Sequence, residues 1–344
     1  MITVLRTWGV ACVLLWQAHA LQAQIYPASK PDQTGEGYSQ TSGTQAERRP
    51  WDLSIRVGFQ YSDNVPHVAD GTLFFSGLDD TSSGLATQIG GVYRFVQNAE
   101  WEVGAALDLD GVAWFDTGEP NDWSFANLIP EIYVRKFFEL LDRPAFVHAG
   151  YEFRQTWLRG DNFLQAHTLD ASLTVQAMPN LFVDAGYAIA FRDFLEEFAE
   201  VEFQSRSGEV HLFHIEGTYW FDGRLRAVTA GYSYAIGDAD GRNYEGDAHA
   251  LRASLITHVT GPLWMKLEGV WTFENYDNGF VQPGTVVPPG REETQVQSYR
   301  VTFVYVIDER WSADVFYNYT IWDSNQSLFS GDENVVGAGI TFKF

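Results

Sequence analysis

Apolar and polar residues alternate one by one over long stretches of this chain. In residues 51–61, the odd-numbered positions are apolar or aromatic, and the even-numbered positions are polar or glycine. Residues 101–110, 181–192 and 311–321 largely repeat the pattern. Because successive side chains of a strand point to opposite faces, the pattern predicts β-strands with one apolar and one polar face.

Fourteen segments carry this alternation, at about residues 51–61, 84–97, 101–115, 124–137, 144–157, 165–178, 181–194, 207–221, 224–236, 247–260, 263–274, 296–307, 311–322 and 332–344. Six connections are short, at residues 98–99, 140–143, 179–180, 222–223, 261–262 and 308–310. Seven are longer, at residues 62–83, 116–123, 158–164, 195–206, 237–246, 275–295 and 323–331. Short turns at one end and long loops at the other predict an all-β, up-and-down antiparallel transmembrane β-barrel of 14 strands.

A membrane environment explains why such a sheet would close. Lipid offers no partner for backbone N–H and C=O groups, so the first strand must pair with the last. Beyond the first residues no run of about 20 apolar residues occurs, so we expect no helical span. Trp, Tyr and Phe make up 15% of the chain, a surplus typical of barrels with two aromatic girdles.

The N-terminal residues have the features of an export signal. Arg6 precedes an apolar stretch at residues 10–16, and small residues offer a cleavage site before or at Ala23, so residues 1–23 are predicted to be a cleaved signal peptide. The only cysteine, Cys12, lies in this stretch, and a lipoprotein signal there is the alternative. Residues 24–50 show no periodic spacing of apolar residues, which predicts a disordered periplasmic tail, with a plug in the lumen as the alternative.

The final segment, residues 332–344, ends in alternating apolar residues and two aromatic ones, Phe342 and Phe344. It resembles the final-strand signal of bacterial outer-membrane proteins. The resemblance implies that the barrel-assembly machinery recognises Phe342 and Phe344, and that the protein resides in the outer membrane of a Gram-negative bacterium.

A second resemblance concerns the opening strand and the overall count. Residues 57–65, Val-Gly-Phe-Gln-Tyr-Ser-Asp-Asn-Val, together with fourteen segments and the ending at 334–344, are similar to the C-terminal barrel of the surface lipoprotein assembly modifier family. That family also carries a tetratricopeptide domain ahead of its barrel, where this chain has the tail. The resemblance implies a role in moving lipoproteins to the surface.

The polar face carries charges of both signs, which water or ion pairs must solvate. We expect fourteen of these side chains to line the lumen: Arg56, Arg94, Asp108, Asp110, Glu131, Arg135, Glu152, Arg154, Asp184, Arg192, Arg252, Glu268, Arg300 and Asp314. They indicate either a polar pore whose charged walls filter solutes or a lumen filled by mutually paired side chains. The interior of a barrel of about 8 strands is just filled by its own side chains, whereas a barrel of about 16 to 18 strands encloses a channel. A barrel of 14 strands therefore favours the pore.

Two histidines share a row of this face with carboxylates: His148 lies in one row with Glu152 and Arg154, and His214 in another with Glu216. Such pairs could bind a metal or transfer protons, but lumenal polar residues without chemistry are the simpler interpretation, so we predict no metal site and no cofactor. Ser254 and His258 share a face but lie about 13 Å apart along a strand, too far for a nucleophile and its base. We therefore expect no enzyme.

The formal net charge of −23 argues against nucleic-acid binding. We interpret the chain as an outer-membrane channel or export conduit for a polar solute or polysaccharide. Its expected partners are outer-membrane lipid and lipopolysaccharide, the barrel-assembly machinery and a periplasmic export partner. The alternative is a non-enzymatic assembly or translocation factor for surface lipoproteins.

Overall fold

A computed structural model describes residues 49–64, 81–115, 124–158, 160–195, 206–222, 225–241, 244–278, 292–325 and 330–344. These residues form fourteen strands: β1 (Trp51–Ser62), β2 (Ser82–Gln97), β3 (Trp101–Trp114), β4 (Phe125–Leu140), β5 (Arg143–Leu158), β6 (Asp161–Met178), β7 (Leu181–Phe194), β8 (Gly208–Phe221), β9 (Arg226–Ala239), β10 (Gly246–Thr260), β11 (Leu263–Tyr276), β12 (Glu292–Val306), β13 (Trp311–Ser324) and β14 (Gly331–Lys343). No helix in the described part is long and apolar enough to cross a membrane.

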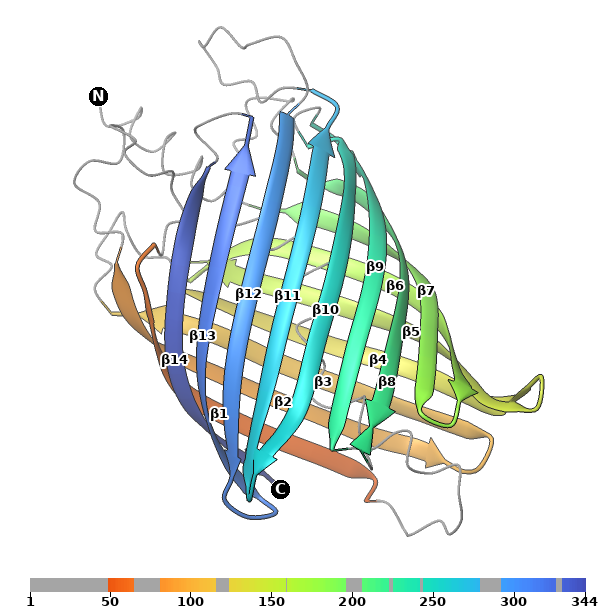
Figure 1. Ribbon diagram of the computed structural model, residues 1–344. Helices are drawn as coiled ribbons and strands as arrows, with labels where there is room; N and C mark the ends of the chain where they lie inside the picture. Colours follow the sequence, from red (N-terminus) through yellow and green to blue (C-terminus); the bar gives the residue numbers. More distant parts are fainter. Residues whose placement is uncertain are drawn as a thin grey trace, which may run out of the picture.

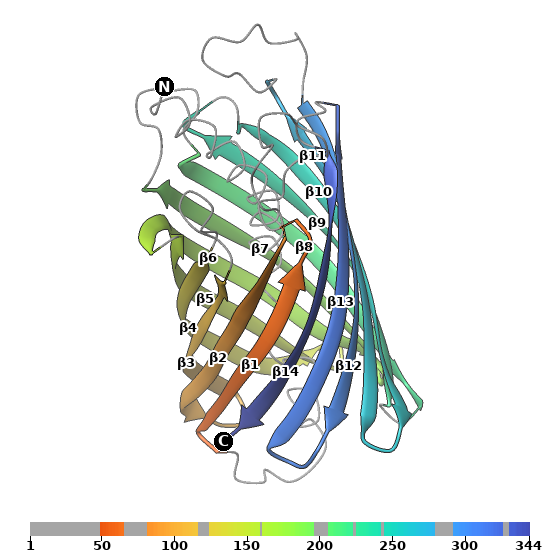
Figure 2. The same ribbon diagram turned by 90° about the vertical axis from the view of Figure 1, so that its left-hand side faces the viewer.

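The strands form one closed antiparallel barrel, as predicted (Figure 1). Each strand pairs with its neighbours in sequence, and β1 pairs with β14 from Ser54 opposite Lys343 to Ser62 opposite Val335. Figure 2 shows these two strands side by side, with the C-terminus at the end of the barrel that carries the short turns. Closure leaves the sheet without an edge, so every strand finds a backbone partner on both sides.

The outer face of the barrel is apolar and exposed. Leu107 and Ile132, near the middle of their strands, are 38% and 60% exposed. Aromatic side chains gather on this face near both ends, with Trp101, Tyr305, Trp311 and Phe344 at the turn end and Phe59, Tyr61, Phe115, Phe191 and Phe273 toward the loop end. An exposed apolar band between two aromatic girdles is the surface that a lipid bilayer covers in outer-membrane barrels.

The largest differences from the predicted boundaries are at the starts of β6 and β12, which both begin four residues earlier than expected. β6 begins at Asp161, because a bulge between Thr156 and Trp157 lets residues 161–164 continue the ladder with β5. The connection predicted at residues 158–164 is therefore only two residues long. β12 begins at Glu292, and its first residues are too polar to show the alternation. The hydrogen-bonded ladder between β12 and β11 nevertheless starts there, with Glu292 opposite Tyr276.

The turn between β4 and β5 consists of Leu141 and Asp142, which have φ angles of 52° and 60°. Positive φ at both central residues defines the type I′ turn that suits two-residue hairpins. This turn fixes the register that sets Arg135 opposite His148.

Lumen-facing side chains near the loop end are buried. Ala250, Thr272 and Val296 are at most 1% exposed. Ala235 and Ala248 form a small apolar core there with Val210 and Leu212 packed against it. Several lumen-facing side chains are therefore covered toward the loops, whereas several charged side chains nearer the turns keep partial exposure.

The predicted signal peptide, residues 1–23, lies outside the described residues, as does nearly all of the predicted tail at 24–50.

Candidate functional site

The register places all fourteen predicted lumen residues on one face of the sheet. Cross-strand partners share a face, so the side can be followed around the barrel from Arg56 through Gln88 to Asp110 and on through the remaining pairs. The large exposed apolar side chains occupy the other face. We use the name charged wall for the following charged residues and histidines of the inner face: Asp52, Arg56, Arg94, Glu102, Asp108, Asp110, Glu131, Arg135, His148, Glu152, Arg154, Asp170, Asp184, Arg192, His214, Glu216, Arg252, Lys266, Glu268, Arg300 and Asp314.

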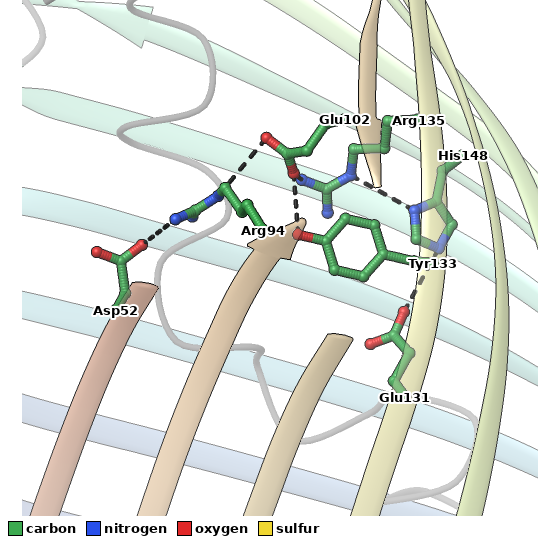
Figure 3. Close-up of polar contacts among 7 residues, drawn as sticks. All are labelled: Asp52, Arg94, Glu102, Glu131, Tyr133, Arg135 and His148. Atoms are coloured by element: carbon green, nitrogen blue, oxygen red, sulfur yellow. Dashed lines mark hydrogen bonds and ion pairs between the residues drawn. The ribbon is translucent and has the colours of Figure 1, made fainter. Parts of the chain in front are cut away.

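The charged wall begins with a chain of contacts over β1 to β4 (Figure 3). Arg94 lies with Nη1 2.6 Å from Asp52 Oδ2 and with Nε 3.6 Å from Glu102 Oε2. Glu102, which is 4% exposed, accepts a hydrogen bond of 3.0 Å from the Tyr133 hydroxyl and lies 3.2 Å from Arg135 Nη1. A buried carboxylate thus has two arginines and a hydroxyl around it, which offsets the cost of its desolvation.

Tyr133 is part of this chain because β3 has a glycine beneath it. A Cβ atom on Gly104 would lie 2.7 Å from the Tyr133 hydroxyl oxygen. The hydroxyl end of the ring therefore lies close to the backbone of β3, and the ring stacks with His148 at 5.9 Å between centroids. Tyr133 was not among the lumen residues predicted from the sequence, although its position on the polar face of an otherwise apolar strand was a signal.

Another ion pair connects β1 to β13 across β14, where the first and last strands of the barrel meet. Arg56 on β1 makes two hydrogen bonds to Asp314 on β13, from Nε at 2.9 Å and from Nη2 at 2.7 Å. Since β14 lies between these strands, the guanidinium must cross its backbone. It crosses over Gly339, where a Cβ atom would lie 2.6 Å from Nη2.

The wall continues over β7 to β11 with two further groups. His214 Nε2 lies 2.7 Å from Asp184 Oδ1, and the Thr174 hydroxyl donates a hydrogen bond of 2.6 Å to the other carboxylate oxygen. Farther around, Arg252 lies between Glu216 at 3.7 Å and Glu268 at 3.8 Å.

Between these groups, His148 on β5 lies beside two carboxylates from its neighbouring strands. Its Nε2 atom is 3.6 Å from Glu131 Oε1 on β4 and 3.0 Å from Asp170 Oδ2 on β6. On the other side of the ring, Arg135 Nε contacts Nδ1 at 3.4 Å. Glu131 and His148 are buried, whereas the Asp170 side chain is 30% exposed.

Both histidines contact carboxylates of neighbouring strands rather than those in the same row of their own strand. His148 lies with Glu131 and Asp170 rather than with Glu152, and His214 lies with Asp184 rather than with Glu216. His148 lies directly opposite Arg135 and Ser172, and His214 directly opposite Gly186 and Ser233, so each carboxylate reaches its histidine diagonally from a neighbouring strand. Diagonal neighbours remain within reach of long side chains, and only the register identifies them.

The remaining predicted residues lie nearer the loop end or outside the main groups. Asp110 accepts a hydrogen bond of 3.0 Å from Asn127 Nδ2, and Arg154 lies 3.5 Å from Glu152. Arg192 is two residues from the loop end of β7, with its guanidinium 6.0 Å from the Phe194 ring. Arg300 lies with its guanidinium 4.1 Å from the Phe316 ring. Asp108 faces the lumen from β3.

No known protein family and no curated protein matches the sequence. Solved structures of outer-membrane proteins do share its fold. An anion-selective porin from Comamonas acidovorans aligns with a TM-score of 0.50 at 9% identity, over 86% of this chain and 98% of that one. The outer membrane channel DcaP of Acinetobacter baumannii aligns with a TM-score of 0.50 at 12% identity, over 86% of this chain and 96% of that one. This chain has the fold of outer-membrane barrels, and no comparison supports the resemblance to the surface lipoprotein assembly modifier family.

Proposed function

We propose that this protein is an outer-membrane channel for small polar or charged solutes. The observation that carries the proposal is the charged wall, which faces the lumen while the opposite face of the same strands is apolar and exposed. Ionised groups stay charged inside a barrel only where water or partners solvate them. A barrel of 14 strands is wide enough to hold that water.

We further propose that the channel prefers cations. Acidic side chains outnumber basic ones among the lumen-facing residues of the described strands. The acidic ones are Asp52, Glu102, Asp108, Asp110, Glu131, Glu139, Glu152, Asp170, Asp184, Glu216, Glu268, Glu274, Glu292, Asp314 and Glu333, and the basic ones are Arg56, Arg94, Arg135, Arg154, Arg192, Arg252, Lys266, Arg300 and Lys343. Rings of carboxylates select cations in other pores.

Burial of lumen-facing side chains at the loop end favours small solutes over a polysaccharide. Ala250, Thr272 and Val296 face the lumen and are almost fully buried, so a wide polymer would have to displace whatever covers them. We propose that the protein reaches the membrane through the signal peptide at residues 1–23 and through recognition of Phe342 and Phe344 by the barrel-assembly machinery.

The first test is single-channel recording in planar bilayers under a salt gradient. We expect stable currents of defined size and a reversal potential of the cation-selective sign. Glu216→Gln with Glu268→Gln removes the two carboxylates beside Arg252, so we expect the reversal potential to move toward that for anions. Glu209→Gln is the matched control, because Glu209 faces outward from β8 with a half-exposed side chain and should leave the reversal potential unchanged.

A correctly folded barrel that carries no current would overturn the channel proposal. The same recording without residues 24–50 tests whether the tail plugs the lumen, since a plug predicts larger currents after its removal.

A further inference from the structure

Three potential metal ligands from three neighbouring strands meet in the charged wall. His148 Nε2 lies 3.6 Å from Glu131 Oε1 and 3.0 Å from Asp170 Oδ2, and ligand atoms of the three side chains all lie within 4.8 Å of one another. Around a tetrahedral Zn²⁺ with ligands at about 2.1 Å, donor atoms are about 3.4 Å apart. The two measured separations bracket that value.

A glycine leaves room for an ion among these donors. A Cβ atom on Gly150 would lie 2.6 Å from Asp170 Oδ1, 3.0 Å from His148 Nε2 and 3.1 Å from Glu131 Oε1. A side chain at residue 150 would therefore crowd all three groups, and Gly150 places none there. An ion would lie farther from the backbone than this Cβ position, in the space between the three donors that the glycine leaves open, and small shifts of the three side chains would bring their donors to bonding distance of it.

The surroundings hold the imidazole ring with Nε2 toward the carboxylates. Tyr133 stacks on one face of the His148 ring at 5.9 Å, and the Tyr133 hydroxyl is itself fixed by Glu102. Metal ligation through Nε2 would leave the ring proton on Nδ1, so the contact from Arg135 to Nδ1 would have to lengthen. At 3.4 Å that contact is already long for a hydrogen bond and costs little to lose.

The ligand types and their burial indicate a class of ion. One imidazole and two carboxylates suit Zn²⁺ and similar first-row divalent ions better than Ca²⁺, which prefers six to eight oxygen ligands. Glu131 and His148 are buried, whereas Asp170 is partly exposed to the lumen. Three protein ligands and access from one side leave a position for water, as in zinc sites that are not purely structural.

We propose that Glu131, His148 and Asp170 form a binding site for one Zn²⁺-like divalent ion in the lumen wall, with Gly150 providing its space. Since β4, β5 and β6 supply one ligand each, the site exists only after these strands have paired. A bound ion would add positive charge to the wall of the lumen and would leave the pairing of the strands unchanged.

The test is titration of the full barrel, folded in detergent and freed of metal, with Zn²⁺ by calorimetry and with Co²⁺ by visible absorption. We expect one site in the wild type with a Co²⁺ spectrum of imidazole and carboxylate ligation. His148→Gln should weaken Zn²⁺ binding at least about tenfold. Gly150→Ala keeps all three ligands but adds a methyl group that would lie 2.6–3.1 Å from all three side chains and push them apart, so we expect a similar loss.

His214→Gln is the matched control. His214 also faces the lumen and lies 2.7 Å from a carboxylate, but the described residues place no second carboxylate ligand in a cluster with it. If His214→Gln weakened binding as much as His148→Gln, or if Gly150→Ala bound Zn²⁺ like the wild type, the proposed site would be wrong. Folding of each variant is checked by circular dichroism, and Asp170→Asn replaces any variant that fails to fold.

Zn²⁺ binding in detergent requires no ion flow through the barrel. Binding by a barrel that carries no current would therefore contradict the channel proposal alone. Currents through a barrel that binds no Zn²⁺ would contradict the metal site alone.

Discussion

Arg56 on β1 contacts Asp314 on β13 across β14, and this contact depends on glycines that have no side chain in its path. Its guanidinium lies over Gly58 and Gly339 and reaches Asp314 on the far side of β14. The two charged side chains are only 20% and 12% exposed, so neither is fully solvated without the other. Loss of one partner would leave the remaining charge with poor solvation, which is the costly case for a buried pair.

We expect Arg56→Ala or Asp314→Ala to lower the free energy of unfolding by about 1–3 kcal/mol each. The double variant should cost clearly less than the sum of the two, with a coupling of about 0.5–3 kcal/mol. Urea unfolding of the barrel in phospholipid vesicles measures all three. The exposed pair of Asp222 and Arg226 is the control, because its side chains are about half exposed and Arg226→Ala should cost about 0–1 kcal/mol.

The β4–β5 hairpin shows how an element's turn determines a site. The two-residue turn at Leu141 and Asp142 sets the register in which Arg135, Tyr133 and Glu131 face His148, Gly150 and Glu152. Leu141 adopts φ 52° and is 89% exposed, so an apolar, β-carbon-bearing residue occupies a left-handed position without packing to compensate. Such a position costs an ordinary residue about 1–2 kcal/mol.

Leu141→Asn should recover part of that cost and raise the free energy of unfolding by about 0.5–1 kcal/mol, since Asn tolerates this conformation better. Leu141→Ala is the matched control: it removes the same exposed apolar surface but keeps the unfavourable backbone position, so no gain is expected. Equal gains from both variants, measured by urea unfolding in vesicles, would show that surface rather than conformation limits stability here.

The whole molecule has an apolar outside and a polar inside, the reverse of a soluble protein. Closure of fourteen strands satisfies the backbone, and the exposed apolar band requires lipid. The energetic cost of a charge on this surface must therefore depend on its depth in the bilayer.

Ile132→Arg places a charge near mid-strand on the outer face and should cost about 2–4 kcal/mol in vesicles, whereas Val259→Arg, close to the turn end of β10, should cost about 0–1 kcal/mol. Unfolding in vesicles of defined thickness measures both. Equal costs at the two depths would contradict the placement of the apolar band in the hydrocarbon layer.

The sequence by itself determined the strands, their number and the face of each side chain. These properties follow from the alternation of apolar and polar residues, which is a local pattern with a period of two. They also follow because one face of the sheet meets lipid and the other meets water. It therefore located all fourteen predicted lumen residues on the correct face. It did not locate the starts of β6 and β12, where a bulge and a run of polar residues hide the alternation.

Only the tertiary structure decided which lumenal residues meet. Sequence alone grouped His148 with Glu152 and His214 with Glu216 because they are close in the chain, whereas the register brings Glu131 and Asp170 to His148, and Asp184 to His214. The contact between Arg56 and Asp314 spans 258 positions and depends on Gly339 between them. Pairing register and barrel closure are properties of the whole sheet, so no local pattern encodes these contacts.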